Sequence, residues 1–404
     1  MTAVNTTRVP GAAPPTAPAS GDERIVRVRF LVRLLQRPEL GALLGAIAVY
    51  GLFALVDGTP GHKFSTIQGM ENWTDAASTY GIMAVAVALL MIGGEFDLSA
   101  GVMTGTSGLL LGALITRSQL NVWLAIVIVL AFAALIGATN GILVVRTKLP
   151  SFIITLATFF VLRGVNVGVT LLLTNTVRFD ISNTASGFAS ARAVFGSTFL
   201  PPYNFQTTVL WWLAIAAAAT WLLNRTTFGN WIYAVGGDAN AARSVGVPVA
   251  RTKIILFMGT ATCAALVGIM TALRYQGIQS GNGVGQEFFY IIAAVVGGCL
   301  LTGGYGSAIG ASIGALIIGF AQIGIIFANW DSNWYFTFLG VILFLAVGVN
   351  TLVRRRAMAA RRRTRAATCK RSTVRRCSRS ETSANTSAVS SPCEICPCRF
   401  EPAR

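Results

Sequence analysis

The sequence predicts an all-α integral membrane protein of about ten transmembrane helices, some of them short or broken, with both termini in the cytoplasm. Hydrophobic residues make up 54% of the 404 residues and charged residues only 12%. A soluble globular domain usually carries roughly 25% charged residues, so most of this chain is not expected to face water. The apolar residues also fall in blocks that are typical of membrane spans.

Ten apolar segments follow one another along the chain, with basic residues clustered between them and at the ends. They cover residues 40–57, 79–93, 102–117, 122–145, 151–174, 207–224, 252–274, 288–301, 308–328 and 334–352. With the N-terminus in the cytoplasm, the inner connections carry most of the Arg and Lys residues, as the positive-inside rule requires. The longest outer connection, about residues 175–206, has room for a short helix on the outer face.

The two ends of the chain differ from the apolar domain at residues 40–353. Residues 1–39 are rich in Ala, Pro and Thr and then basic, which predicts a disordered cytoplasmic extension without a signal peptide. Residues 354–404 form a basic tail with Ser and Cys, for which two interpretations stay open: a disordered segment that binds anionic membrane lipid, or the product of a frameshifted reading. This tail holds 14 Lys and Arg and three Glu, so it supplies most of the net charge of +17. The charge therefore does not predict nucleic-acid binding.

Two of the segments are too short to cross a membrane, with about 14–15 residues each: Tyr80–Gly94 and Phe288–Leu301. Each ends in a pair of glycines and is followed by a Gly-rich stretch and a helix that contains Gly-Ala-Leu-Ile. This weak internal repeat points to a transport site near the middle of the membrane, where short, Gly-interrupted segments of two halves meet. Glycine also lets helices approach closely, and the two interpretations are compatible.

The inner connection at residues 225–253 contains the signals of a miniature helix. Gly236 and Gly237 predict a turn, and Asp238 is a good N-cap because its carboxylate can accept hydrogen bonds from the first free amides. An Ala-rich run follows, and Gly246 suits the left-handed position after a helix. A two-turn helix is unstable alone in water. It must pack either under its own membrane domain or against a partner protein.

The sequence lacks the motifs of a self-contained enzyme. It has no GxxxxGK[ST] phosphate loop, so ATP-driven transport would need an ATPase on another polypeptide. The single histidine, His62, lies in an outer connection without a nucleophile that it could activate. The CxxC of the tail, Cys393 to Cys396, lacks the further ligands of a zinc site, so neither a catalytic nor a metal site is predicted.

Three stretches carry a resemblance to a known family. The first is Gly93–Gly101, which is similar to a GGxDLSxG signature with Glu95 inserted. The second is Thr147–Leu156. The third is Phe228–Arg251, followed by Ile291–Gly298 and Leu301–Gly306. Over about residues 40–353 the chain resembles the ribose-type permease subunits of bacterial ABC sugar importers. The resemblance implies a multi-pass protein of the bacterial inner membrane that translocates a monosaccharide, a pentose or a similar sugar.

The resemblance also implies partners and site residues. A cytoplasmic ABC ATPase would bind ATP and Mg, a periplasmic sugar-binding protein would deliver the substrate, and a second permease chain would complete a homodimer. No cofactor is expected on this chain. The inner connection becomes the ATPase-coupling loop, with Gly236, Gly237, Asp238, Asn240, Ala241, Arg243 and Gly246 as its candidate residues.

Six polar residues are candidates for the substrate path: Glu95, Asp97, Ser99, Asn140, Gln276 and Glu287. Carboxylates near the membrane are costly and usually face protein or water. Glu95 and Asp97 have a structural alternative, because either could cap the helix that begins near Ser99.

Three other functions remain open from the residues. A secondary transporter would typically carry ion-coupling carboxylates inside its spans; here the interiors have almost none, although Arg163 lies within the fifth segment. An intramembrane transferase would need clustered catalytic residues at one interface, and none is found. An ABC permease for a solute other than a sugar has the same sequence features as a sugar permease.

Overall fold

The computed structural model describes residues 38–345 and 348. The predicted N-terminal extension and the predicted basic tail lie outside the described residues, apart from residues 38 and 39. The helices, in chain order, are α2 (Pro38–Val56), η1 (Lys63–Ser65), α3 (Ile67–Ile92), α4 (Ser99–Thr116), α5 (Val122–Thr147), α6 (Ser151–Thr174), α7 (Phe188–Phe195), α8 (Thr207–Arg225), α9 (Thr227–Gly237), α10 (Ala239–Ser244), α11 (Val249–Tyr275), α12 (Gln286–Val296), α13 (Ala308–Phe327) and η2 (Ser332–Trp334), the last opening a helix that covers Ser332–Leu345. The short strands are β1 (Arg178–Asp180), β2 (Thr198–Phe199), β3 (Phe205–Gln206) and β4 (Gly277–Gln279).

The described part of the chain contains eight helices that are long and apolar enough to cross a membrane: α2, α3, α4, α5, α6, α8, α11 and α13. Each of the ten predicted segments contains one helix, so the prediction of an all-α membrane protein is confirmed. The predicted short helix of the outer connection is α7. Helix α12 has 11 residues and rises only about 16 Å, so it is too short to cross a bilayer, as predicted.

Helix α3 corrects the prediction that its segment is also short. It begins at Ile67 and has 26 residues, enough to rise about 39 Å. The additional turns contain Glu71, Asn72 and Asp75, whose polarity is typical of a connection rather than of a membrane helix. The structure compensates one of these charges, because Arg274 of α11 donates hydrogen bonds of 2.7 and 2.8 Å to the two carboxylate oxygens of Asp75.

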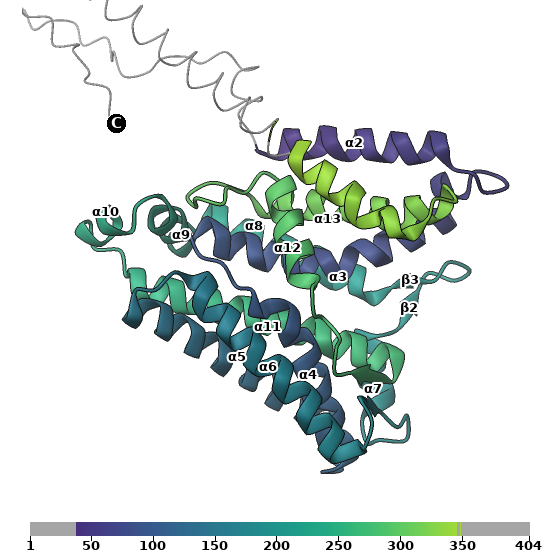
Figure 1. Cartoon of the computed structure of the whole chain (residues 1–404), viewed down its shortest axis with the longest axis horizontal. Coiled ribbons are helices and arrows are strands. Elements are labelled where there is room, and N and C mark those ends of the chain that lie inside the picture. The colour runs from purple at the N-terminus through teal and green to yellow at the C-terminus, as the bar shows by residue number, and fades with distance from the viewer. Residues whose placement is uncertain (1–37, 346–347, 349–404) are drawn as a thin grey trace, which may run out of the picture. The chain divides into compact units, whose positions relative to one another are not determined.

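The helices form two groups that pack against each other (Figure 1). Helices α2, α3, α8, α12 and α13 make one group, and α4, α5, α6 and α11 make the other. Helix α11 joins them, because it packs on α4 and α5 and also on α3. Helices α9 and α10 lie at one end of this arrangement, and α7, β2 and β3 lie toward the opposite end (Figure 1).

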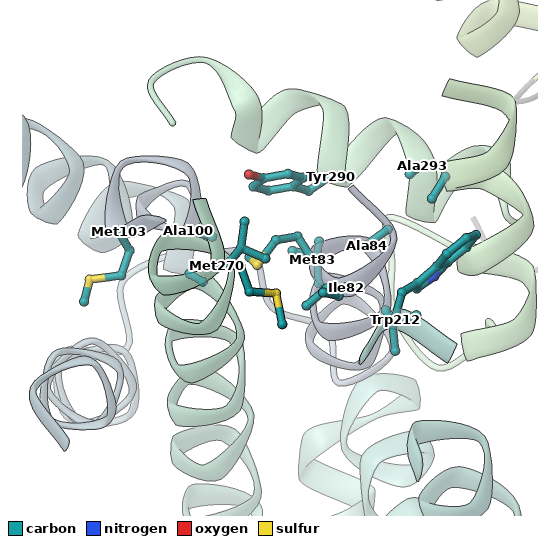
Figure 2. Packing of buried hydrophobic residues seen from close by; sticks show 14 of the residues in the cluster. Ile82, Met83, Ala84, Ala100, Met103, Trp212, Met270, Tyr290 and Ala293 are labelled. Carbon is teal, nitrogen blue, oxygen red and sulfur yellow. The ribbon is translucent and has the colours of Figure 1, made fainter. Parts of the chain in front are cut away.

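Buried side chains of moderate size fill the junction between the two groups. Figure 2 shows Met83 of α3 and Met270 of α11 close together, with Tyr290 of α12 above them. Each of the three is at most 1% exposed. Because lipid is as apolar as these side chains, close packing rather than exclusion from water is what holds them together.

A row of glycines on α4 holds the chain that leads into α12. These residues are Gly101, Gly105, Gly108 and Gly112, and their spacing of three or four places them on one face of the helix. A β-carbon at the first would lie 2.0 Å from Glu287 Oε2, and one at the second would lie 2.2 Å from the Asn282 carbonyl oxygen. The non-helical segment 280–285 therefore runs directly against the α4 backbone. Irregular backbone at membrane depth is tolerated where protein covers it or where it lines a water-filled cavity.

The two glycine pairs end α3 and α12 in the same way. Gly94 and Gly298 both adopt the left-handed conformation, with φ of 83° and 93°, which glycine reaches without steric cost. The next amide in each case donates to the carbonyl five positions earlier, at 3.1 Å for Glu95 and 3.0 Å for Cys299. This is the hydrogen-bond pattern of a Schellman cap. The internal repeat is thus present in the backbone of the two caps.

Candidate functional site

The inner connection predicted to be a loop begins with a helix, α9. Its N-cap Thr226 accepts a hydrogen bond from the Gly229 amide, and Ile232 and Val235 are buried one turn apart. The helix ends at Gly237, so the prediction of a turn at the Gly236-Gly237 pair is wrong. Gly236 itself packs at backbone distance against the Ile92 carbonyl and the Gly304 nitrogen, and this packing outweighs the weak helix propensity of glycine.

The predicted miniature helix is α10, and its cap is the one expected from the sequence. Asp238 leaves the helical conformation and accepts hydrogen bonds from the amides of Asn240 and Ala241, at 2.8 and 3.0 Å. Gly246 has a φ of 86°, the left-handed conformation expected after the helix. We call residues 227–246 the α9–α10 unit.

Helix α10 has one buried side and one open side. Ala242 packs with Val235 of α9 and Val249 of α11 in a small apolar cluster of its own. Arg243 is exposed, and Val245 is 80% exposed. The two alternatives for this helix are therefore compatible: it rests on its own domain with one side and presents a cation beside an apolar side chain with the other. Arginine is enriched in contact surfaces between proteins.

The end of α9 lies in backbone contact with the turns that follow both α3 and α12. A β-carbon at Gly236 would lie 1.7 Å from the Ile92 carbonyl oxygen and 2.7 Å from the Gly304 nitrogen. The Gly304 amide itself donates to the Ile92 carbonyl at 2.8 Å. A β-carbon at Gly303 would lie 2.7 Å from the Gly236 carbonyl oxygen. A displacement of α9 therefore acts on both turns without an intervening side chain.

Two side-chain contacts strengthen this junction. Lys253, in the first turns of α11, forms an ion pair with Glu95, whose side chain is only 9% exposed. The hydroxyl of Tyr233 on α9 donates to the Gly306 carbonyl at 2.9 Å. Glu95, a candidate path residue, is thus held by a cation that follows the α9–α10 unit in the chain.

Three other candidate path residues come together between α4, α5 and α6. Asp97 accepts a hydrogen bond from the Ser99 amide at 2.8 Å, and the Asn140 side-chain amide donates to the Ser99 hydroxyl at 3.1 Å. Thr158 of α6 donates to the Asn140 carbonyl oxygen at 2.6 Å. Burial raises the pKa of the Asp97 carboxyl to about 6, although the hydrogen bonds from Ser99 and from the Ala100 amide act against this shift. The network fixes the start of α4 to its two neighbours.

Comparison with known proteins shows the family to which the chain belongs. A family described as "Branched-chain amino acid transport system / permease component" matches residues 69–347, more than half of the chain. The ribose import permease of Escherichia coli strain K12 is 33% identical over 318 residues, which cover 78% of this chain and 94% of that protein. The chain belongs to this permease family. It is a multi-pass permease of the inner membrane. The predicted family and the predicted membrane location are therefore confirmed.

Other relatives of the permease are named for different sugars. The fructose import permease of Rhizobium meliloti is 30% identical over 297 residues, covering 73% of this chain and 81% of that protein. The xylose transport system permease of Escherichia coli strain K12 is 28% identical over 375 residues, covering 77% of this chain and 91% of that protein. No solved structure matches the chain.

The remaining two candidate path residues of the permease lie apart from the network. Gln276 ends α11 with a φ of 51°, and its carbonyl accepts a hydrogen bond from the Ile181 amide of the outer connection at 2.9 Å. Glu287 lies in the first turn of α12, is 4% exposed, and accepts a hydrogen bond from the Gly285 amide at 3.0 Å. The six candidates therefore do not form one cluster.

Sequence reasoning missed several residues of the permease that the structure brings into the junction. From the sequence, Lys253 was only one of several basic residues in the inner connections. Gly303 and Gly304 were only part of the stretch Leu301–Gly306 that resembles the family. A signal for Lys253 was available in the sequence. Glu95 is an insertion in the family signature, and a buried carboxylate is stable only with a positive charge beside it. No signal in the sequence shows that Gly236 meets the turn before α13.

Proposed function

We propose that this permease is the membrane-spanning subunit of an ABC importer that carries a monosaccharide, a pentose or a similar sugar, across the inner membrane. Its relatives are named as import permeases for ribose and fructose and as a transport-system permease for xylose. The ATPase is a separate subunit that binds ATP and Mg, since the sequence has no GxxxxGK[ST] loop. Among the described residues, no group of three or more His, Cys, Asp or Glu side chains could hold a metal ion.

The α9–α10 unit is the observation that carries this proposal. Its capped helix α10 exposes Arg243 and Val245 for contact with the ATPase, while Gly236 touches the turns after α3 and α12 at backbone distance. Closure of two ATPase subunits pulls on α10, and the glycine contacts pass the displacement to both turns. Each turn leads directly into the next spanning helix, α4 or α13. The two helix groups thereby move between outward-open and inward-open states.

The other partners follow from the same division of labour. A periplasmic sugar-binding protein delivers the sugar to the outer end, where α7 and the strands lie. A second copy of the permease completes the path as a homodimer, and membrane lipid surrounds both. The path itself needs only modest polar contacts with the sugar, because a permease that bound the sugar tightly would retain it.

The test is co-purification of a tagged permease after mild detergent extraction, with ATPase activity measured in the eluate. We expect a stoichiometric partner with ATPase activity. Reversing the exposed charge with Arg243→Glu should leave membrane insertion intact and reduce sugar uptake at least tenfold, because the ATPase contact is lost. Arg146→Glu is the matched control, since Arg146 is an exposed arginine at the end of α5.

Two outcomes would contradict the proposal. Normal uptake by the Arg243→Glu permease would remove α10 from the coupling surface. A chain that purifies alone and drives solute uptake into liposomes from an ion gradient would make it a secondary transporter.

A further inference from the structure

An apolar hollow lies at the far end of α13. The turn before this helix meets Gly236 of the α9–α10 unit, and its 20 residues rise about 30 Å, so the hollow is at the opposite end of the permease. It has a volume of about 450 Å³, within the roughly 300–1,000 Å³ of small-molecule sites. Ile325 of α13 lines it, together with Trp330 and Asp331 of the connection that follows. The rest of the lining is one face of the helix Ser332–Leu345.

That face carries lining residues at the spacing of one side of a helix: Trp334, Thr337, Phe338 and Val341. Trp334 and Val341 are 63% and 53% exposed, so the hollow opens at the surface of the subunit. They are seven residues apart, so the face extends for about 10 Å along the helix. Apart from Asp331 and Thr337, the lining side chains are aromatic or aliphatic. The hollow therefore suits a hydrocarbon chain and offers few partners to a sugar.

One buried ring holds the hollow in shape. Phe53 of α2 is 1% exposed, and its ring centroid lies 6.0 Å from that of Trp330 and 5.3 Å from that of Phe338. Gly324 of α13 leaves room for this ring, because a β-carbon there would lie 2.3 Å from the Phe53 Cγ atom. Two of the lining rings are thus supported from behind by α2, which runs beside the last described helix (Figure 1). The hollow is formed by the packing of the subunit itself.

A carboxylate stands at one end of the hollow. Asp331 Oδ1 accepts a hydrogen bond from the Asn333 amide at 2.9 Å, and none of the ion pairs in the described part of the chain includes Asp331. Trp330 and Trp334 lie on either side of it in the sequence and are both exposed. Tryptophan is enriched at the level of the lipid head groups, where its apolar ring meets lipid and its N–H meets water. A charge at this level, followed by an apolar groove, has the polarity of a phospholipid.

We propose that the hollow binds one phospholipid whose head group carries a primary ammonium, with an acyl chain along the face from Trp334 to Val341. The ammonium has three N–H donors and pairs with Asp331, whereas an anionic head group meets a like charge. A helix of a second permease fits this face poorly, because membrane helices approach one another through small residues and the face presents Trp334 and Phe338. The site does not depend on which solute the permease carries.

The test is native mass spectrometry of the tagged permease, extracted in mild detergent and washed to remove loosely held lipid. Equal amounts of phosphatidylethanolamine and phosphatidylglycerol with the same acyl chains are then added. We expect one retained lipid per permease chain and a preference of about fivefold for phosphatidylethanolamine, as for an exposed ion pair. Asp331→Asn keeps an acceptor for the Asn333 amide and removes the charge, so this preference should disappear while a lipid is still retained.

Val341→Trp fills the hollow and should lower the retention of both lipids at least fivefold. Phe344→Trp is the matched control, because Phe344 is 81% exposed on the same helix and does not line the hollow. The melting temperatures of both variants show that each is folded. Equal retention by the two variants, or equal retention of the two lipids by the unmodified permease, would overturn the proposal.

A second measurement asks whether another permease chain covers the hollow instead. The seven native cysteines are replaced, and Val341→Cys is oxidised in membranes that contain the whole importer. We expect no disulfide-linked permease dimer, because lipid separates this face from other subunits. Efficient cross-linking would make the face a contact between permease chains and overturn the lipid site. Neither measurement needs ATP hydrolysis, so both are independent of whether Arg243→Glu uncouples transport.

Discussion

The turn after α3 and the turn after α12 have the same cap and different supports. In both, a left-handed glycine lets the next amide reach back to the carbonyl five positions earlier. Side chains of three helices hold the first turn: Ser151 and Thr155 of α6 accept hydrogen bonds from its backbone amides, Asn140 of α5 donates to Ser99, and Lys253 of α11 pairs with Glu95. The second turn has a backbone bond from the Leu300 amide to the Tyr305 carbonyl at 3.1 Å, and the hydroxyl of Tyr233 on α9 donates to its Gly306 carbonyl at 2.9 Å.

This difference shows which properties of a repeat are local. The cap follows from a Gly-Gly pair at the end of an apolar helix, so both halves share it. The contacts that hold each turn in place come from residues far away in the sequence, and they differ between the two halves. The two turns meet again only at Gly236, which touches both.

The largest effect is expected where the two turns meet. Gly236→Ala places a β-carbon 1.7 Å from the Ile92 carbonyl oxygen and 2.7 Å from the Gly304 nitrogen. These are backbone atoms that cannot rotate away, so the overlap should cost about 3 kcal/mol and disturb both turns. The measurement is the melting temperature of the purified permease in detergent, together with sugar uptake.

Gly237→Ala is the control for this experiment. A β-carbon at Gly237 meets nothing within 4 Å, and alanine favours the helix over glycine by about 1 kcal/mol. Its melting temperature should match or exceed that of the unmodified chain. Equal behaviour of the two variants would show that the contact at Gly236 is not needed.

An intermediate effect is expected from the side-chain support of the first turn. Asp97→Ala removes the acceptor for the Ser99 amide and leaves buried donors unsatisfied, so we expect a loss of about 2 kcal/mol in stability. Asp97→Asn keeps one acceptor oxygen and should preserve most of the stability. The melting temperatures of both variants test this difference.

Uptake kinetics of Asp97→Asn separate the two roles proposed for this residue. Because the carboxylate of Asp97 accepts a hydrogen bond from Ser99 and the residue is 2% exposed, we expect an unchanged preference among sugars. A changed preference would place Asp97 in the substrate path.

The smallest effect is expected at the second turn. Ser307 caps α13 by accepting one hydrogen bond from the Gly310 amide at 2.9 Å. Ser307→Ala should cost about 1 kcal/mol, as for other helix caps, and Ser307→Asp should restore the loss. If Ser307→Ala lowers the melting temperature as much as Asp97→Ala, the two turns do not differ in the way that their contacts indicate.

The fold was largely predictable because lipid leaves a clear pattern of apolar blocks. The exception was the beginning of α3, where Glu71 and Asp75 interrupt the pattern and the distant Arg274 compensates the charge of Asp75. Sequence information at one position does not reveal a partner 199 residues away. Helix α9 was missed for a related reason, since its glycines suggested a turn and only packing keeps them helical.

The candidate site was predictable where its signals are local. Asp238 and Gly246 follow from the chemistry of helix ends, and the structure shows both as expected. The contacts of the candidate path residues were not predictable, because spacing along the chain does not show which polar groups pair with each other. Asp97, Ser99 and Asn140 meet in one network, whereas Gln276 and Glu287 lie near other elements.

The glycine face of α4 also sets an order of events while the protein is being made. The insertion machinery cannot release α12 into lipid as a separate span, because segment 280–285 is irregular backbone, which is tolerated at membrane depth only where protein covers it or where it lines a water-filled cavity. Helix α4 ends 170 residues before α12 begins, so the surface that covers this segment is already synthesised when α12 emerges from the ribosome. We therefore expect α12 to remain at the translocon until it packs against α4. It should enter the membrane together with α13, as a late step of biogenesis.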